Sequence, residues 1–454
     1  MQQSLAATLL TLLAYLFGLL GGGSTSPGWL GSITGNGQDQ GPLDTPPAVI
    51  RTANGLELSI DQPVAVNSAT ANIRSQPSTK AARVAVANRG TVLRVLKADS
   101  DWLYVRLPNS KTGWVSVALV RVPTAVGGSI GRPNPGHKEV IGYYATNSDA
   151  DTDALQSLVA NANVLTGVAP FSFSVDSYGN VDGRHDARAM SEAKRKGIAT
   201  LALVHNYTGD RFDSSVISSV LESPSRRSRL VTSIAATLRA YGYQGVNIDF
   251  ENVPARDRDE LSVFLQELAQ VLHRNGFLAT ISVPAKTEED SSNAWSGAFD
   301  YAAIGRSADR VMVMAYDENY RVGPPGPVAS IGWVEKVIRY SVRNIPSSKV
   351  ILGVAGYGYN WPLNGENGYA VSTQEAESIA RRFGVSPSWS DEHKVPYITY
   401  RSGSQVRRIW YEDSDSLAYK LRLVDQYGLR GIALWRLGYE DPQIWSVLAR
   451  EEKG

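Results

Sequence analysis

The chain has 454 residues, of which 43% are apolar and 20% charged, and its formal net charge is +1. This length predicts two or three globular domains, and the near-neutral charge argues against a protein that binds nucleic acid by neutralising many phosphates. The absence of cysteine excludes disulfides, thiolate metal sites and a thiol nucleophile.

The N-terminal stretch "MQQSLAATLLTLLAYLFGLLGGG" carries no charge from residue 5 to residue 20. Such a run is typical of a signal-peptide core or a short membrane anchor, and a buried helix is the remaining alternative. No Lys or Arg precedes it and no A-x-A cleavage site follows, which leaves open whether it is removed. We expect residues 1–22 to direct export, with possible N-terminal membrane attachment, and residues 23–59, rich in small and polar residues, to form a flexible linker.

Residues 60–122 contain short β-branched runs separated by turns, a pattern that predicts a small all-β barrel. The segments "ANIRSQPS", "TVLRVL", "DWLYVRL" and "KTGWVS" resemble a bacterial SH3-like domain. This resemblance implies a module that binds the cell wall or acts as a spacer. We expect Trp102 and Trp114 in its core, the alternative being a binding platform. The Gly/Pro-rich residues 123–137 are a predicted second linker.

Residues 138–454 alternate strand-like and helix-like segments. The strand candidates are residues 139–145, 164–175, 198–206, 245–251, 278–285, 310–317, 350–359 and 431–438. Eight strands alternating with helices predict an α/β protein, a (β/α)₈ TIM barrel. A doubly wound open sheet is disfavoured, since no Gly-rich phosphate loop follows the first strand. The long segment between strands 7 and 8 predicts a small α+β insertion at about 360–415.

The fourth strand candidate, within "YQGVNIDFENV", has an unusual polar face. Apolar side chains at 246, 248 and 250 alternate with Asn247, Asp249 and Glu251. The active site of such barrels lies at the C-terminal strand ends, where we expect Glu251. Two carboxylates that close in a partly desolvated site raise each other's proton affinity. The outer one then stays an acid near neutral pH and can protonate a glycosidic oxygen.

The same stretch resembles the DxxDxDxE signature of glycoside hydrolase family 18, the chitinase-like enzymes, with Glu251 as the acid. "MAYD" resembles the family's sixth-strand motif, "GIALWRLG" its eighth-strand motif, and "IGYY" and "FSF" its first two strands. The resemblance implies further residues at the sugar, namely Met314, Tyr316, Asp317, Trp435, Tyr143 and Phe173. The closing run from "IWYEDSDS" resembles the branch that includes spore-cortex-lytic N-acetylglucosaminidases.

Two departures from the family pattern affect the site. Gln244 and Asn247 stand where the signature has its first two Asp residues, and Asn247 can hydrogen-bond Asp249 but cannot share a proton with it. "LALVHNYTG" replaces the family's Ser/Gly motif after the third strand. Part of the substrate-binding floor must therefore be built differently.

The resemblance implies a retaining, substrate-assisted mechanism. Glu251 would protonate the leaving oxygen while the substrate's 2-acetamido carbonyl attacks the anomeric carbon. Asp249 would hold the acetamide N–H and Tyr316 would orient its oxygen. Asn247, Asp317, Met314, Trp435, Tyr143 and Phe173 would contact substrate. The five histidines show no HxxxH or HExxH spacing, so we expect neither a metal nor a cofactor.

These observations together predict an exported hydrolase of N-acetylglucosamine linkages in peptidoglycan, extracellular or wall-associated. Chitin oligomers are the alternative substrate. The alternative from another functional class is a glycan-binding wall protein without catalytic activity. The departures from the family signature at Gln244 and Asn247 are compatible with this alternative.

Overall fold

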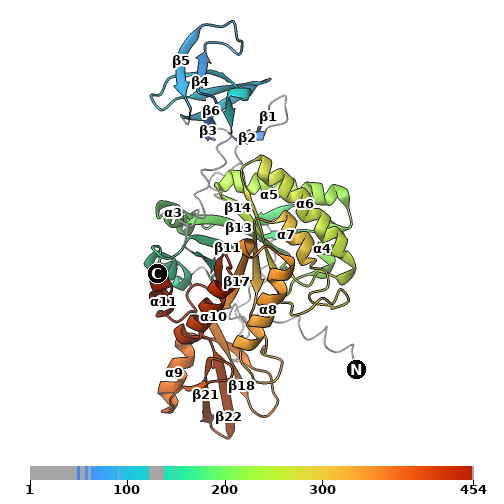
Figure 1. Cartoon of the computed structure of the whole chain (residues 1–454), viewed down its shortest axis with the longest axis vertical. Coiled ribbons are helices and arrows are strands. Elements are labelled where there is room, and N and C mark those ends of the chain that lie inside the picture. The colour runs from blue at the N-terminus through green and yellow to red at the C-terminus, as the bar shows by residue number, and fades with distance from the viewer. Residues whose placement is uncertain are drawn as a thin grey trace, which may run out of the picture. The chain divides into compact units, whose positions relative to one another are not determined.

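A computed structural model describes residues 49–51, 57–59, 63–89, 91–121, 138–148 and 150–451, and its fold comprises two compact units (Figure 1). The predicted export segment at 1–22 and the linker at 123–137 lie outside these residues. Part of the predicted first linker is ordered, because β1 (Val49–Arg51) pairs antiparallel with β2 (Glu57–Ser59). Within the described part of the chain, no helix is long and apolar enough to span a bilayer.

The N-terminal unit is a strongly curved antiparallel sheet with the order β5-β4-β8-β7-β6-β3-β9. Its strands are β3 (Pro63–Val66), β4 (Thr70–Arg74), β5 (Arg83–Asn88), β6 (Val92–Asp99), β7 (Trp102–Arg106), β8 (Thr112–Ser116) and β9 (Val120–Arg121). In β7 the inward Leu103 and Val105 are fully buried, while Arg106 faces solvent, as a period of two requires. The predicted small all-β unit is confirmed.

The two tryptophans of this unit differ in their surroundings. Trp114 is buried and its ring lies 5.2 Å from that of Tyr104, with the Lys97 ammonium over both rings. Trp102 is partly exposed. Neither belongs to the apolar cluster that fills the unit, which consists of smaller aliphatic side chains such as Leu93 and Val115.

The C-terminal unit is a closed barrel of eight parallel strands, which confirms the predicted fold. The strands are β10 (Glu139–Tyr144), β11 (Gly167–Val175), β13 (Ala199–His205), β14 (Gly245–Asp249), β15 (Leu278–Pro284), β16 (Arg310–Met314), β17 (Val350–Ala355) and β23 (Gly431–Trp435). The barrel closes where β10 pairs with both β11 and β23. A short strand, β12 (Val181–Gly183), extends β11 antiparallel.

Helices cover the outside of the barrel (Figure 1). They are α2 (Asp153–Ala160), α3 (Ala187–Arg195), α4 (Ser214–Leu221), α5 (Pro224–Tyr241), α6 (Arg258–Arg274), α7 (Tyr301–Ser307), α8 (Ile331–Asn344), α10 (Ser414–Gln426) and α11 (Ile444–Glu451). The leucines of α6 that recur at helical spacing are buried against the strands, and Gly276, with a φ of 76°, follows its end.

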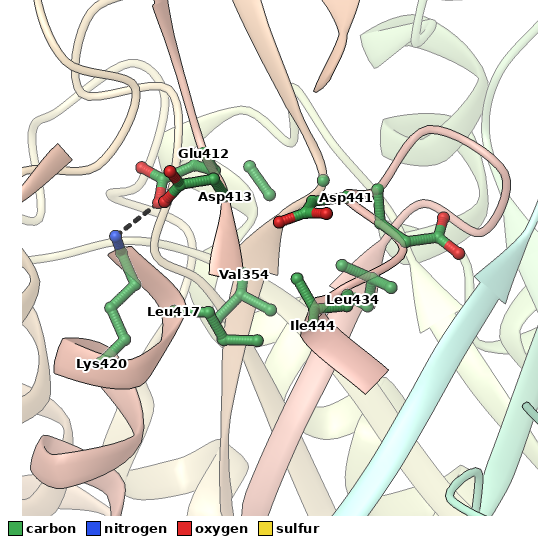
Figure 2. A pocket seen from close by; sticks show the side chains of 11 residues that line it. Val354, Glu412, Asp413, Leu417, Lys420, Leu434, Asp441 and Ile444 are labelled. Atoms are coloured by element: carbon green, nitrogen blue, oxygen red, sulfur yellow. Dashed lines mark hydrogen bonds and ion pairs between the residues drawn. The ribbon is translucent and has the colours of Figure 1, made fainter. Parts of the chain in front are cut away.

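The predicted insertion between strands 7 and 8 is also present. It is a five-stranded antiparallel sheet of β18 (Tyr357–Pro362), β19 (Tyr369–Ser372), β20 (Ser388–Ser390), β21 (Val395–Ser402) and β22 (Gln405–Tyr411), with the helix α9 (Thr373–Phe383). Within it, β19 is followed directly by α9. Where the insertion returns to the barrel, Glu412 and Lys420 form a buried ion pair of 2.6 Å (Figure 2).

The alternation in β14 divides its side chains between two environments. Val246, Ile248 and Phe250 belong to the apolar layer between strands and helices. Asn247 and Asp249 have the opposite parity and point into the barrel, where the residues of a separate cluster, including Met312 and Trp435, pack. The barrel interior therefore receives the polar face that the sequence predicted.

The opposite, N-terminal end of the barrel is tied together by Glu139, which has no exposed surface. Its carboxylate accepts hydrogen bonds from Nε and Nη2 of Arg310, each at 2.9 Å. It also forms an ion pair with Arg430 at 2.6 Å. These arginines come from β16 and from the residue before β23. The contacts therefore link three segments that are far apart in the sequence.

We predict that Glu139→Gln lowers the free energy of unfolding by about 3 kcal/mol, because it leaves two arginines without their buried counter-charge. Urea denaturation of the full chain, followed by circular dichroism, measures the loss. Glu377→Gln is the matched control, since its pair with Arg381 is exposed, and its effect should stay below about 0.5 kcal/mol. Equal effects of the two substitutions would contradict the proposed role of Glu139.

Candidate active site

A cavity of about 410 Å³ opens at the C-terminal ends of the barrel strands. Its lining combines carboxylates with many aromatic rings: Tyr143, Phe171, Tyr207, Arg211, Phe212, Asp249, Glu251, Asn252, Ser282, Pro284, Ala285, Trp295, Met314, Tyr316, Asp317, Glu318, Tyr320, Trp333, Tyr357 and Trp435. A second hollow, beneath the insertion (Figure 2), holds only about 10 Å³, the room of one water molecule. Of these two, only the first can admit a sugar.

Glu251 lies two residues beyond the end of β14, and its backbone is fixed from both sides by one side chain. The Glu251 N–H donates to Asn206 Oδ1 at 3.0 Å, and Asn206 Nδ2 donates to the Glu251 carbonyl at 2.9 Å. Asn206 is completely buried at the end of β13. Asn252, the next residue, adopts a left-handed φ of 57°. This turn follows the strand directly and keeps Glu251 in the cavity.

Burial raises the pKa of Glu251 well above its usual value, and the nearby charges of Asp249 and Asp317 raise it further. Burial also raises the pKa of Asp249, and a hydrogen bond with Ser282 partly lowers it. A carboxylate loses hydration in such a site, and two like charges disfavour a joint ionised state. The site therefore favours the protonated form of Glu251 up to a higher pH than an exposed carboxyl group would keep it.

Asn247, which we predicted to contact substrate, lies below the cavity and is not among the residues that line it. It has no exposed surface, and Ser282 Oγ donates to its Oδ1 at 3.0 Å. Its Nδ2 donates to Thr280 Oγ1 at 3.2 Å. Ser282 is in turn 2.9 Å from the Tyr143 hydroxyl. Asn247 thus supports Asp249 from beneath through Ser282, the residue that also hydrogen-bonds Asp249.

The sixth-strand motif lines the cavity with Met314, Tyr316 and Asp317. Asp317 accepts hydrogen bonds from Tyr357 at 2.5 Å and from Tyr359 at 3.0 Å, both on β18 of the insertion. Its φ of 62° is rare for a residue other than glycine, and such strain is common at functional sites. Burial raises the pKa of Asp317 to about 6, while the two tyrosine hydrogen bonds lower it.

Three aromatic rings meet at the bottom of the cavity. The Trp435 ring lies 5.4 Å from Tyr143 and 5.9 Å from Phe171, both edge-on. Trp435 and Tyr143 thus lie in the lining as predicted, and their contact with substrate stays a prediction. These rings present apolar faces of the kind that pack against the C–H surface of a sugar.

Phe173, which we predicted at the site, is not among the residues that line the cavity. Phe173 is buried in the layer between strands and helices, where its ring packs against Tyr241 and Tyr243. The register between β11 and β13 shifts between Phe171 and Phe173, which reverses the inward and outward parity of the strand. Phe171 therefore faces the cavity in its place.

The segment that replaces the missing Ser/Gly motif forms an aromatic wall. His205 stacks on Phe171 with 4.1 Å between ring centroids and a 15° interplanar angle. Tyr207 and Phe212 follow at 5.4 Å from each other and line the cavity. Burial lowers the pKa of His205 to about 3, so the imidazole is neutral. This side of the cavity is therefore built from flat rings.

Sequence reasoning missed several of the residues that build the cavity. Ser282 shares the inward parity of Thr280 in an otherwise apolar strand, so the period-two pattern could have identified it. Trp295 is a single large ring in the polar segment "EEDSSNAWSG", a second usable signal. Asn206, Tyr207 and Phe212 left no comparable pattern. In the described part of the chain, no group of His, Asp and Glu side chains has the arrangement of a metal site.

Comparisons with known proteins agree with this architecture. Residues 139–440 match the family described as glycosyl hydrolases family 18, and residues 69–121 match the bacterial SH3 domain. The uncharacterised glycosylase YvbX of Bacillus subtilis (strain 168) is 30% identical over 322 residues, which cover 70% of this chain and 94% of that protein. The cortical fragment-lytic enzyme of the same organism is 29% identical over 313 residues, 68% of this chain and 73% of that enzyme.

Among solved structures, the spore cortex-lytic enzyme SleL of Bacillus megaterium QM B1551 superposes with a TM-score of 0.66 at 30% identity. The match covers 70% of this chain and 75% of SleL. The chitinase of Chromobacterium violaceum ATCC 12472 gives 0.65 at 27% identity, covering 69% of this chain and 98% of that enzyme. The family match, which spans more than half of the sequence, shows that this chain belongs to glycosyl hydrolase family 18 and is a glycosidase that also carries a bacterial SH3 domain.

Proposed function

We propose that this glycosidase is exported and cleaves N-acetylglucosamine linkages in peptidoglycan by a retaining, substrate-assisted mechanism. The observation that carries the proposal is the position of Glu251, partly buried beside Asp249 and Asp317 in a cavity of about 410 Å³. Such a carboxyl group keeps its proton until a leaving group needs it.

The geometry supports a distinct task for each residue. Glu251 donates its proton to the glycosidic oxygen as the C–O bond breaks, while the acetamide carbonyl oxygen of the substrate attacks the anomeric carbon. Asp249 accepts a hydrogen bond from the acetamide N–H and stabilises the cationic oxazolinium intermediate. Tyr316 donates to the acetamide oxygen. The resulting Glu251 carboxylate then takes a proton from the water that opens the intermediate.

Asp317 and Trp435 complete the sugar site in this scheme. Asp317 accepts from a sugar hydroxyl while Tyr357 and Tyr359 hold its carboxylate, and Trp435 and Met314 pack against the ring. Tyr143 supports Asp249 through Ser282. Because the substrate itself supplies the nucleophile, the mechanism needs an N-acetyl group on the reacting sugar.

Two features favour peptidoglycan over chitin as the substrate. The bacterial SH3 domain at residues 69–121 suits a protein retained at the cell wall, and the related enzymes include one whose name identifies it as lytic for cortical fragments. The related chitinases make chitin oligomers the second candidate. The presence of Glu251, Asp249 and Tyr316 in the cavity lining argues against a purely glycan-binding role.

Mass spectrometry of the products from purified peptidoglycan and from chitin oligomers tests the substrate assignment. We expect muropeptides with a new reducing-end N-acetylglucosamine, released faster than any chitin product. Release of chitin fragments alone would assign the enzyme to chitin, and products that end in muramic acid would contradict the proposed bond.

Glu251→Gln should lower kcat by at least about 10³-fold, because the amide cannot donate a proton to the leaving oxygen. The glutamine fills nearly the same volume, so we expect glycan affinity, measured by calorimetry, to change by less than about threefold. Reducing-end release measures turnover. Asp210→Asn serves as a control, because Asp210 is an exposed loop carboxylate and its loss should leave turnover unchanged. Full turnover by Glu251→Gln would refute the acid assignment.

Asp317→Asn should shift the alkaline limb of the pH profile of kcat/KM to lower pH. The acid works only while protonated, so activity falls as pH rises through the pKa of Glu251. Asp317 is ionised above about pH 6, and its negative charge raises the pKa of Glu251. Removing that charge therefore lowers the pKa of Glu251. Glu392→Gln, a change at an exposed insertion residue, should leave the limb in place. An unshifted or raised limb in Asp317→Asn would show that the two carboxyl groups are not coupled.

A further inference from the structure

The segment between β15 and α7, residues 285–300, carries Trp295 to the cavity and is fixed by contacts from Lys286 and Arg258. Most of this segment is exposed from residue 287 to residue 294. An exposed polar loop of this kind is normally variable in conformation. In this protein, by contrast, side-chain contacts fix the segment.

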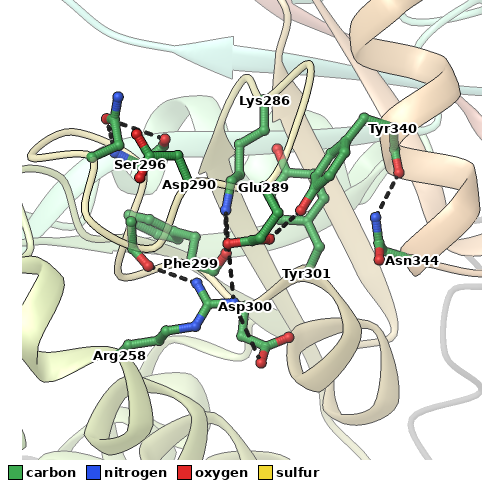
Figure 3. Close-up of polar contacts among 12 residues, drawn as sticks. Arg258, Lys286, Glu289, Asp290, Ser296, Phe299, Asp300, Tyr301, Tyr340 and Asn344 are labelled. Carbon is green, nitrogen blue, oxygen red and sulfur yellow. Dashed lines mark hydrogen bonds and ion pairs between the residues drawn. The ribbon is translucent and has the colours of Figure 1, made fainter.

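The two ends of the segment are joined by a buried lysine. Lys286 Nζ donates to Glu289 at 2.9 Å and to the Phe299 carbonyl at 3.3 Å, and its side chain is almost completely buried (Figure 3). Tyr340 of α8 donates to the same Glu289 carboxylate. Removing a lysine from water is costly unless the lysine is paired. The buried Lys286 therefore holds Glu289 and Phe299 close together.

The barrel helix α6 fixes the segment from a second direction. Arg258, its first residue, donates to the Gly297 carbonyl at 2.6 Å and pairs with Glu289 at 3.3 Å and Asp300 at 3.5 Å (Figure 3). Gly297 has no room for a side chain, because a Cβ there would lie 2.5 Å from the Asn293 carbonyl oxygen. The backbone folds back on itself at this point.

The tip of the segment presents one large apolar group. Asn293 Oδ1 accepts from the backbone N–H groups of Trp295 and Ser296, both at 2.9 Å, and so sets the direction of the Trp295 backbone. Trp295 is partly exposed and lines the cavity. Within the described residues it belongs to none of the apolar clusters and stacks on no other ring. Trp333, by contrast, also packs against the barrel core.

We propose that Trp295 is a stacking platform for a sugar other than the one that reacts, so that the enzyme binds glycan chains better than short fragments. This inference rests on the proposed function, since it takes the cavity to be the site of glycan cleavage. A large, partly exposed ring outside the apolar clusters stays in contact with water unless substrate covers it. A pinned loop lowers the entropy cost of placing that ring, which favours binding. Asn293 is then a positioning residue that acts through Trp295.

The test measures binding by calorimetry, independently of cleavage. The ligands are di- and tetrasaccharides of N-acetylglucosamine and the matching oligomers from peptidoglycan, each titrated into the full-length Glu251→Gln protein with and without Trp295→Ala. Without the second change, we expect tighter binding of the tetrasaccharide than of the disaccharide. Trp295→Ala should weaken tetrasaccharide binding about tenfold or more and change disaccharide binding by less than about twofold. Trp295→Phe should retain most of the affinity.

Asn293→Ala should weaken tetrasaccharide binding more than disaccharide binding, as Trp295→Ala does, because it frees the backbone of Trp295. Asn293→Asp should keep the original affinities, because a carboxylate can accept the same two hydrogen bonds. Asn293 is exposed, so neither change threatens folding. Trp389→Ala removes another partly exposed tryptophan, on the insertion, and should leave both affinities unchanged.

Equal affinity for di- and tetrasaccharides before Trp295 is changed, or equal weakening of both by Trp295→Ala, would overturn the proposal. The proposed reaction would fail differently, through an absence of turnover by the protein with Glu251 intact. Binding to Trp295 and cleavage by Glu251 are therefore judged by separate measurements.

Discussion

The central constraint in this structure is the crowding of three carboxyl groups into a partly dry cavity, which disfavours their ionisation. Glu251, Asp249 and Asp317 come from neighbouring regions of the barrel rim, and each has a pKa raised first by burial. In water these groups would ionise independently. Inside the cavity the ionisation of one opposes that of the next, which favours a state in which one of them keeps its proton. The remaining features of the site either exclude water or hold these three carboxyl groups in position.

The supports for these groups come from unexpected parts of the chain. Asn206 fixes the backbone of Glu251, Ser282 hydrogen-bonds Asp249, and two tyrosines of the insertion hold Asp317. The insertion is therefore a structural part of the active site as well as one wall of it. A barrel that lost β18 would leave the Asp317 carboxylate without these two hydrogen bonds, and its strained backbone without support.

The substitution of Asn247 for the family's usual Asp has a physical consequence. An amide at this position cannot take the proton of Asp249, and here it orients Ser282 through its Oδ1. The hydroxyl of Ser282 then lies between Asn247, Tyr143 and Asp249. Asp249 is therefore supported by neutral groups, Asn247 and Ser282, and not by a second carboxylate that could share its proton. This difference lies below the cavity and leaves Glu251 in its lining.

The sequence alone determined the features that depend on local periodicity. Alternation from Val246 to Glu251 identified the polar face of β14, because neighbouring side chains of any strand point to opposite sides. The repeat of strands and helices likewise determined the barrel, and the long segment before strand 8 determined the insertion. Each of these signals lies within a short stretch of chain.

Only the tertiary structure decided which residues meet in the cavity. The bulge in β11 depends on its register with β13 and replaces Phe173 with Phe171. The partners of Asn247 come from β15, and those of Asp317 from the insertion. The position of Trp295 depends on a lysine and an arginine that pin its loop. Pairing between distant segments leaves no periodic trace in the sequence, because each partner satisfies its own local pattern whether or not the other is present.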